Sequence, residues 1–322
     1  MKNFTKLALV SSIAFSANAM AMQAMDDAAL SSTTGQDGIN IGIGISKVEI
    51  EKLFIHDNDG LTDTAKGGTS TAGAIVIKGN GIKGDDLENK GIIIGANYEN
   101  GGAYLLKTGN LADLRIDTDA GTGANGAFIN IAADVSGLDI KIGEIGVTAS
   151  GTAGTTGIRR GGKLEGTDAN YNAILSGLSL KTGPMTANVQ LGAAPQGAMI
   201  KLSTTMKGGL EIKDLGILDA STKTATREAG EIFIESIKVA DAGKTDLTIN
   251  QDVRIYGKEG TNNGYIQMVS NSGPIDNYVR GVHLGSRDAG SIGDIEVQGL
   301  QTYYSPSLGA YTPGSVITIS SK

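Results

Sequence analysis

Residues 210–217 read Leu-Glu-Ile-Lys-Asp-Leu-Gly-Ile, and this stretch carries the pattern that decides the fold. Apolar side chains alternate with other residues in each half, as they do in a half-buried β-strand. The two residues between the halves, Lys213 and Asp214, shift the alternation by one position. A straight strand would then turn its second half toward the opposite face of the sheet. A bulge or corner at the gap returns both halves to one core, so the stretch predicts a bent strand.

The same pattern returns at three other places, residues 48–55, 232–239 and 295–302. The copies are unevenly spaced, so they lack the fixed period of a regular solenoid. Glycine makes up 48 of the 322 residues, a content that disfavours helices and suits many turns. We therefore predict one glycine-rich all-β domain, residues 22–322, with long bent strands. It is either an elongated β-sandwich or roll, or an irregular β-solenoid, and we favour the sandwich or roll.

The first 21 residues have the three parts of a secretory signal. Lys2 and Lys6 are basic, a short apolar stretch follows, and small residues end it. The apolar stretch is too short to span a membrane as a helix. We expect cleavage after Ala21, with Ala19 as the alternative, and no transmembrane segment in the mature chain. The protein is therefore expected to be exported to the periplasm, the outer surface or a pilus or fimbrium.

Charge and composition limit the partners and the chemistry of the mature chain. The formal net charge is −7, and removal of the signal lysines makes the chain more acidic. An acidic chain without a basic cluster does not suit nucleic acid or anionic lipid surfaces. Cysteine is absent, which excludes a cysteine nucleophile and a cysteine zinc site. The two histidines, His56 and His283, stand where ordinary strand or turn residues are expected, so we predict no enzyme and no catalytic residue.

One loop has the residue types of a metal site. Asp57, Asp59 and Asp63 surround Gly60, and oxygen ligands at alternate positions with a glycine turn suit Ca²⁺. No bidentate glutamate follows at the expected distance, and the same residues suit an exposed turn that closes a hairpin. We favour the turn, with Ca²⁺ at Asp57, Asp59 and Asp63 as the alternative and no other cofactor. The pairs Asp117/Asp119 and Asp85/Asp86 carry a weaker signal of the same kind.

A family resemblance begins just after the signal. Residues 22–39 include Met-Gln-Ala-Met-Asp-Asp, Leu-Ser and Thr-Gly-Gln-Asp-Gly-Ile. This segment resembles the opening of the FilA-like putative pilus system proteins, exported Gram-negative proteins with a DUF6160-like domain of unknown function. Met25 stands where the family more often has leucine, a substitution that conserves volume. Residues 113–121 and 137–147 also resemble such proteins. The resemblance implies a surface role associated with a pilus or fimbria, and it implies no catalytic residues.

These observations predict an exported structural or adhesive protein that works through β-sheet assembly or surface contact. Its expected partners are other pilus-system proteins or further copies of itself. The C-terminal segment 315–320 reads as a short strand that either closes its own sheet, which we favour, or pairs with a neighbouring subunit. The alternative function is a secreted polysaccharide-binding or polysaccharide-active β-solenoid protein, for which Tyr303, Tyr304 and Tyr311 could stack on sugars.

Overall fold

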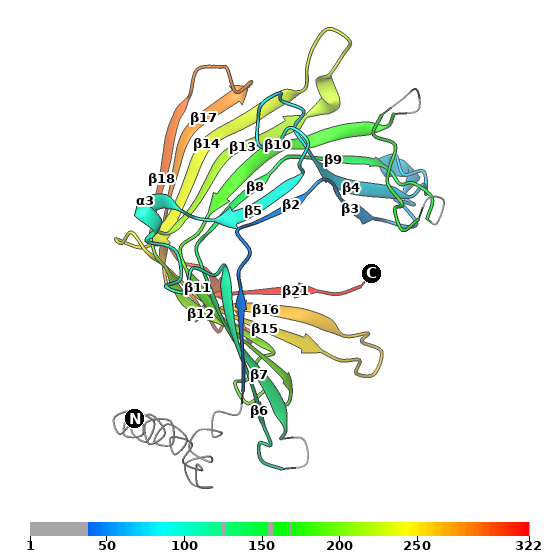
Figure 1. Cartoon of the computed structure of the whole chain (residues 1–322). Helices are drawn as coiled ribbons and strands as arrows, with labels where there is room; N and C mark the ends of the chain where they lie inside the picture. Colours follow the sequence, from blue (N-terminus) through cyan, green and yellow to red (C-terminus); the bar gives the residue numbers. More distant parts are fainter. Residues whose placement is uncertain (1–37, 124–125, 154–156, 166, 168, 322) are drawn as a thin grey trace, which may run out of the picture. The chain divides into compact units, whose positions relative to one another are not determined.

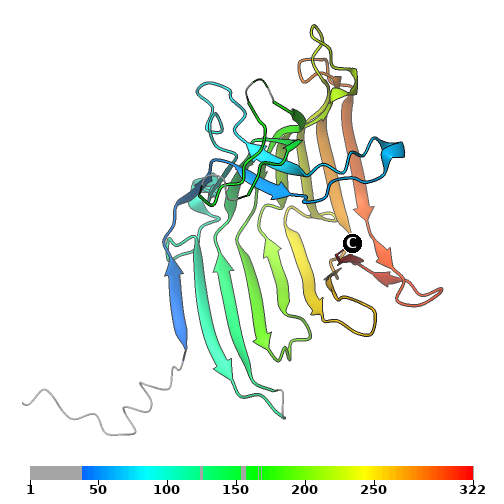
Figure 2. The same cartoon turned by 90° about the vertical axis from the view of Figure 1, so that its right-hand side faces the viewer.

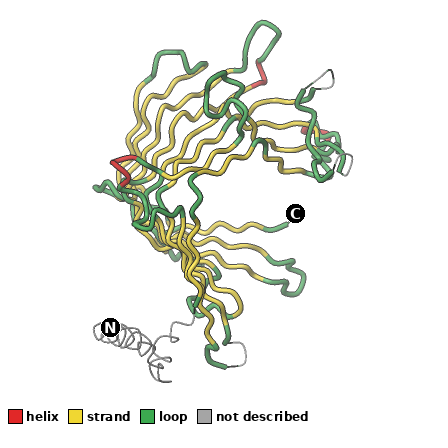
Figure 3. The backbone as a smooth tube through the Cα atoms, in the orientation of Figure 1, coloured by secondary structure: helices red, strands yellow, loops and turns green. Residues whose placement is uncertain are grey.

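The computed structural model describes residues 38–123, 126–153, 157–165, 167 and 169–321 (Figures 1 and 3). The chain divides into two units, Met1–Ile39 and Asn40–Lys322. The predicted signal, residues 1–21, and nearly all of the family segment 22–39 lie outside the described residues. The second unit is built of strands, so the predicted all-β class is confirmed. The helical elements of the described part are three short turns, η1 (Thr64–Lys66), α3 (Glu99–Gly102) and η2 (Ala220–Thr222).

The strands form an eight-stranded sheet, here sheet A, an eleven-stranded sheet, here sheet B, and a small hairpin. Sheet A contains β1 (Ile39–Ile43), β6 (Ala112–Asp119), β7 (Phe128–Val135), β11 (Met185–Gly192), β12 (Ile200–Met206), β15 (Leu247–Tyr256), β16 (Tyr265–Ser270) and β21 (Ser315–Ile319). Sheet B contains β2 (Lys47–Ile50), β3 (Leu53–His56), β4 (Gly73–Lys78), β5 (Ile92–Ala96), β8 (Leu138–Ile142), β9 (Glu144–Ala149), β10 (Tyr171–Lys181), β13 (Leu210–Asp219), β14 (Gly230–Asp241), β17 (Ile275–Gly285) and β18 (Gly293–Leu300). The hairpin consists of β19 (Tyr303–Tyr304) and β20 (Thr312–Pro313).

The two sheets have the same strand order. Sheet A runs β1-β6-β7-β11-β12-β15-β16-β21, and the main path of sheet B runs β2-β5-β8-β10-β13-β14-β17-β18. Each strand of one sheet is thus joined through the chain to the strand at the same place in the other. The unit is an eight-strand meander whose strands each cross from one sheet to the other (Figure 2). Neighbouring strands pair antiparallel, which fits the sandwich or roll and not the parallel coils of a β-solenoid.

The backbone changes direction where the sequence gap predicts it. In the 210–217 copy, Asp214 has a left-handed φ of 57° inside β13. The pairs on either side, Ile212 with Ile237 and Leu215 with Ile234, are both apolar. In the 48–55 copy the strand divides into β2 and β3. Both halves of these copies therefore keep apolar partners, as the predicted bend requires.

Three of the eight strands bend a second time within sheet B. Their outer pieces are β3, β4 and β9, which pair with one another beside β10. Gly143 lies between β8 and β9, and its N–H donates to the Gly91 carbonyl at 2.8 Å. A Cβ atom at Gly143 would lie 2.3 Å from the Lys78 carbonyl oxygen. Only glycine allows these backbones to approach so closely, which makes the bend possible.

Continuous rows of apolar side chains cross both sheets. One row crosses sheet B from edge to edge through Ile295, Val279, Ile237, Ile212, Leu180, Ile140, Ile94 and Val48. A second joins Leu284, Ile232, Ile217, Leu175, Ile145, Ile77 and Leu53. The row of sheet A joins Ile116, Ile131, Val189, Ile200, Val253, Met268 and Ile317. The centres of these rows are half-buried and several of their ends are exposed.

Full burial is confined to a few places. Among the buried apolar residues, Met206, Ala240 and Leu247 lie where strands cross between the sheets, and Val76 and Ile93 lie in β4 and β5. Many large apolar side chains elsewhere on the sheets remain exposed. The core is therefore concentrated near the crossings and around β4 and β5.

Buried polar side chains hold the crossings between the sheets. Ser136, in the turn from β7 to β8, is fully buried and donates to the Asn110 carbonyl at 2.8 Å. Its hydroxyl also accepts from the Leu106 N–H at 3.0 Å. Buried Asn97 donates to the Thr182 carbonyl at 3.0 Å. Backbone groups that leave a sheet ladder at a corner lose their strand partners, and these side chains replace them.

Ser136→Ala should lower the free energy of unfolding of the mature chain by about 1 to 2 kcal/mol, because two backbone groups at the corner lose their partner. Urea unfolding followed by circular dichroism measures the change. Ser305→Ala is the matched control, because its hydroxyl bonds the Ser307 carbonyl in an exposed turn and its loss should cost less than about 0.5 kcal/mol. Equal unfolding midpoints for Ser136→Ala and the unaltered chain would contradict the role of this residue.

Asp276 should make the fold sensitive to acid. Its carboxylate accepts the N–H groups of Gly243 and Gly299, each at 2.7 Å. These two bonds, the Gly243 bond foremost, lower the pKa of Asp276 below its ordinary value of 3.8. The stabilisation is therefore complete above pH 3.8 and is lost as the pH falls through the lower folded-state value.

Between about pH 5 and pH 2, Asp276→Asn should flatten the fall of the melting temperature with acid. Thermal melts across this range measure it. Asp117→Asn, on the exposed part of β6, serves as the control. A slope for Asp276→Asn as steep as that of the control would refute the link.

Candidate functional site

A hollow of about 840 Å³ lies against sheet B and has a charged lining. Lys78, Glu144, Ser176 and Glu231 line it, and each adjoins in sequence a member of the second apolar row. Successive strand residues point to opposite faces, so the charged hollow and the apolar row lie on opposite faces of the sheet. Arg287, from the turn after β17, completes the lining.

Glu231 and Arg287 form a tightly bonded pair. Glu231 is 8% exposed, and its Oε1 accepts from Arg287 Nη2 at 2.7 Å. Its Oε2 accepts from Arg287 Nε and from the Arg287 backbone N–H, both at 3.2 Å. Ser176 donates to Glu231 Oε1 at 3.0 Å and accepts from Arg287 Nη2 at 2.8 Å. The guanidinium also lies 4.8 Å from the centre of the Phe233 ring, a cation–π distance.

This geometry keeps Glu231 ionised. Burial by itself would raise the pKa of the carboxyl, but the hydrogen bonds from Arg287 and Ser176 outweigh it and hold the pKa below its ordinary value of 4.5. The same contact with Glu231 raises the pKa of Arg287. A carboxylate held in its charged form by a fixed cation suits structure and polar recognition better than general acid chemistry, which needs a pKa near the working pH.

A second cluster lies at the other side of the hollow. Lys78 Nζ is 2.8 Å from Glu144 Oε1. Tyr171 donates to the same Glu144 oxygen at 2.8 Å, and Lys78 lies 4.8 Å from the centre of the Tyr171 ring. Burial and the Glu144 hydrogen bond raise the pKa of Tyr171, so its hydroxyl stays protonated as a donor. The hollow thus offers fixed donors and acceptors of both charges, an arrangement suited to a polar ligand.

Arg287→Ala should destabilise the fold by roughly 2 to 3 kcal/mol, because it leaves the carboxylate of Glu231 buried without its cation. Differential scanning calorimetry of the mature chain measures it. Arg280→Ala, which removes an exposed arginine that pairs with Glu235 at 3.4 Å, should cost less than about 1 kcal/mol. Similar losses for the two variants would show that the buried pair is not special.

The structure places the predicted calcium residues in a loop after β3. Asp57 Oδ1 accepts the N–H groups of Asp59 and Gly60 at 3.3 and 3.4 Å. Asp63 accepts the Ala65 N–H at 3.1 Å at the start of η1, and Lys66 lies 3.3 Å from its other oxygen. Asp57 and Asp63 thus serve the turn that the sequence analysis favoured. Within the described ranges, no group of three or more His, Cys, Asp or Glu side chains is placed to hold a metal ion. Calcium at Asp57, Asp59 and Asp63 stays a prediction.

The two weaker acidic pairs also take part in local structure. Asp119 accepts the Gly121 N–H at 2.6 Å, and Asp86 pairs with Lys141.

The two histidines share no hydrogen-bond partner. His56 stacks on Phe54 at 5.7 Å, and its Nδ1 lies 2.5 Å from Ser150 Oγ. Burial, followed by the charge of Arg160, lowers the pKa of His56. It lines a separate hollow of about 760 Å³.

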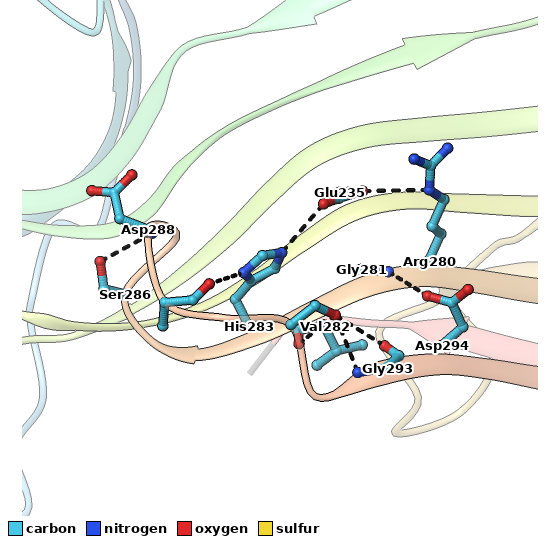
Figure 4. Close-up of polar contacts among 11 residues, drawn as sticks. Glu235, Arg280, Gly281, Val282, His283, Ser286, Asp288, Gly293 and Asp294 are labelled. Carbon is cyan, nitrogen blue, oxygen red and sulfur yellow. Dashed lines mark hydrogen bonds and ion pairs between the residues drawn. The ribbon is translucent and has the colours of Figure 1, made fainter.

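His283 is a strand residue of β17, but its side chain is largely covered. Its side chain is 12% exposed, because the turn that follows β17 lies against it (Figure 4). The Nδ1 atom donates to the Ala289 carbonyl at 2.5 Å, and Nε2 lies 3.4 Å from Glu235 Oε1. These contacts anchor the turn that carries Arg287.

Sequence reasoning missed the residues of the charged hollow. Glu231 and Arg287 are separated by 56 positions, and Ser176 and Arg287 by 111. The one local signal is that polar residues adjoin the apolar row in several strands. That signal identifies a face of a sheet, but it does not say which polar residues meet on it.

Comparison with known proteins gives a partial match. Residues 1–121 match the model of a family described as a family of unknown function (DUF6160). The segment 22–39 that carries the sequence resemblance lies inside this match. No curated protein and no solved structure matches the chain. In the described part of the chain, no helix has both the length and the apolar character needed to cross a membrane.

Proposed function

We propose that this chain is an exported structural or adhesive protein that acts by sheet-mediated assembly or surface contact. The observation that carries the proposal is the exposure of apolar side chains along the sheets. Ile255 and Ile319 of sheet A, and Ile55 and Leu284 of sheet B, are each more than half exposed. Soluble monomers rarely leave extended apolar surface in water, and such surface marks sites of contact with another molecule.

The sequence supports the same proposal independently. The signal pattern of residues 1–21 favours export, and the resemblance of residues 22–39 implies a pilus or fimbria. The expected partners are other pilus-system proteins or further copies of this chain. The match to a family of unknown function is compatible with this role and leaves the partner open.

The C-terminal strand β21 pairs within its own sheet and also lies at the edge of that sheet. β21 pairs with β16 along its whole length, so the segment completes its own sheet, as the sequence analysis favoured. β21 is the last strand of sheet A in the described part of the chain, so the side of β21 that faces away from β16 is an edge of the sheet. The same strand can therefore belong to its own sheet and still present an edge to a partner.

Polysaccharide binding is the second candidate function. Tyr303, in the β19–β20 hairpin, and Tyr311, just before β20, are both exposed. Exposed aromatic rings on a fixed hairpin suit stacking on sugars. The charged hollow on sheet B adds donors and acceptors for hydroxyl groups.

The proposal predicts that the mature chain forms assemblies at the cell surface through its apolar rows. Surface immunolabelling with electron microscopy of intact and gene-deleted cells locates it, and sedimentation velocity measures assembly. Ile255→Lys with Leu284→Lys should abolish most assembly or surface contact. The first places a charge beside Ile266 and Ile319, which continue from Ile255 across sheet A, and the second places a charge in the second apolar row. Leu308→Lys is the matched control, since Leu308 is fully exposed in a turn outside the rows.

Localisation of the protein in the cytoplasm would overturn the proposal. A monomeric sedimentation coefficient that is the same for the unaltered chain and the Ile255→Lys, Leu284→Lys variant would also overturn it. Retention on immobilised polysaccharide that depends on Tyr303 and Tyr311 would favour the second candidate instead.

A further inference from the structure

Both sheets end in open edges that belong to the same two strands of the meander. In the described part of the chain, β1 and β2 lie at one edge, and β18 and β21 lie at the other. The order is visible in Figure 2, where the blue strand lies at one side of its sheet and the orange and red strands lie at the opposite side. A strand edge carries backbone N–H and C=O groups that can pair with another strand.

The strand directions at these edges are complementary. Neighbouring strands of the meander run antiparallel, and the meander crosses between the sheets eight times. Its first strand runs from sheet A to sheet B, and its eighth runs from sheet B to sheet A. The eighth strand of one copy is therefore antiparallel to the first strand of a second copy in the same orientation. An odd number of strands would have placed parallel strands at this junction.

The first apolar row of sheet B ends at the same edges. Every residue of β18 is exposed, and Ile295, at the end of the first apolar row, is 52% exposed. Val48, at the other end of this row, is 37% exposed. In sheet A, Ile317 of β21 and Ile41 of β1 are likewise exposed at opposite edges. A second copy would thus continue the first apolar row of sheet B from Ile295 to Val48, which buries both exposed ends.

Charge favours this arrangement over pairing between two identical edges. With Ile295 opposite Val48, antiparallel register places Glu296 opposite Lys47. Asp294 then faces Glu49, but both carboxylates already have partners. Asp294 accepts from the Gly281 N–H (Figure 4) and from the Tyr278 hydroxyl, and Glu49 pairs with Lys90 as well as with Lys47. Two β18 edges paired with each other would instead set Glu296 against Asp294. Like charges directly opposite are destabilising.

We propose that copies of this chain join head to tail, with β18 and β21 of one copy paired to β2 and β1 of the next. Each added copy leaves the same free edge, so the interface is heterologous and the assembly grows as a fibre. Eight strands about 4.8 Å apart give a repeat of at most about 38 Å per copy. This inference rests on the proposed function and names the partner and the surfaces that it uses.

The absence of cysteine allows a direct test. Val48→Cys and Ile295→Cys in one mature chain place thiols opposite each other only across the proposed junction, within reach of a disulfide. Under mild oxidation the double variant should give a ladder of disulfide-linked multimers on a non-reducing gel. The control, Val48→Cys with Leu308→Cys, uses the fully exposed Leu308 and should give less than a tenth of that yield.

A charge exchange at the same junction provides the second measurement. Glu296→Lys in the double-cysteine chain should reduce the multimer yield several-fold, and adding Lys47→Glu should restore it. Both side chains are exposed, so neither change threatens folding.

The outcomes separate this inference from the proposed function. Surface assemblies that form without the ladder would overturn the head-to-tail junction and leave the function standing. Efficient dimers from Ile295→Cys alone would show pairing of identical edges and overturn it too. The chain's own segment 22–37 is the other candidate occupant of the β2 edge. A linked monomer from Val48→Cys with a cysteine in that segment, in place of the ladder, would also overturn the junction.

Discussion

The structure depends on one constraint: strands that cross between the sheets must do so without leaving backbone groups unpaired. Most of the crossings are short, and several contain a buried polar residue such as Asn97, Ser136 or Thr182. The Thr182 hydroxyl accepts the Leu138 N–H at 2.9 Å, so neighbouring crossings are bonded to one another. Because the crossings lie side by side, the two sheets must share their strand order. The rows, the faces and the edges described above all follow from that shared order.

Because side chains alternate along each strand, the two faces of sheet B carry different kinds of residue. One face carries the apolar rows, which are not fully covered. The other carries ion pairs such as Glu231 with Arg287 and Lys78 with Glu144, whose members satisfy one another. Replacing one member of such a pair leaves the charge of its partner unpaired, which lowers the stability of the fold. Replacing an apolar residue at an exposed end of a row changes the stability little. Stability and contact with partners can therefore change independently.

Much of the fold could be predicted from local pattern, because alternation and its interruption are local properties. The gap at Lys213 and Asp214 predicted a bend, and Asp214 has the left-handed backbone there. The turn role of Asp57 and Asp63 could also be read from the sequence. The charged hollow could not, because Glu231 and Arg287 meet only when β14 pairs with β17, and β15 and β16 separate these two strands in the sequence. Burial of His283 was missed for the same reason: a turn beyond its own strand covers it.

The shared strand order has a consequence for how the chain acquires its structure. Most strands pair with strands close to them in sequence, as β13 does with β14 and β15 with β16. Contacts of short sequence separation form quickly, because little loop entropy is lost in making them. A polypeptide delivered end first can therefore add each new crossing to a template already in place. Growth of the sheet then follows the order of synthesis, and the first strands do not need the last residues in order to pair.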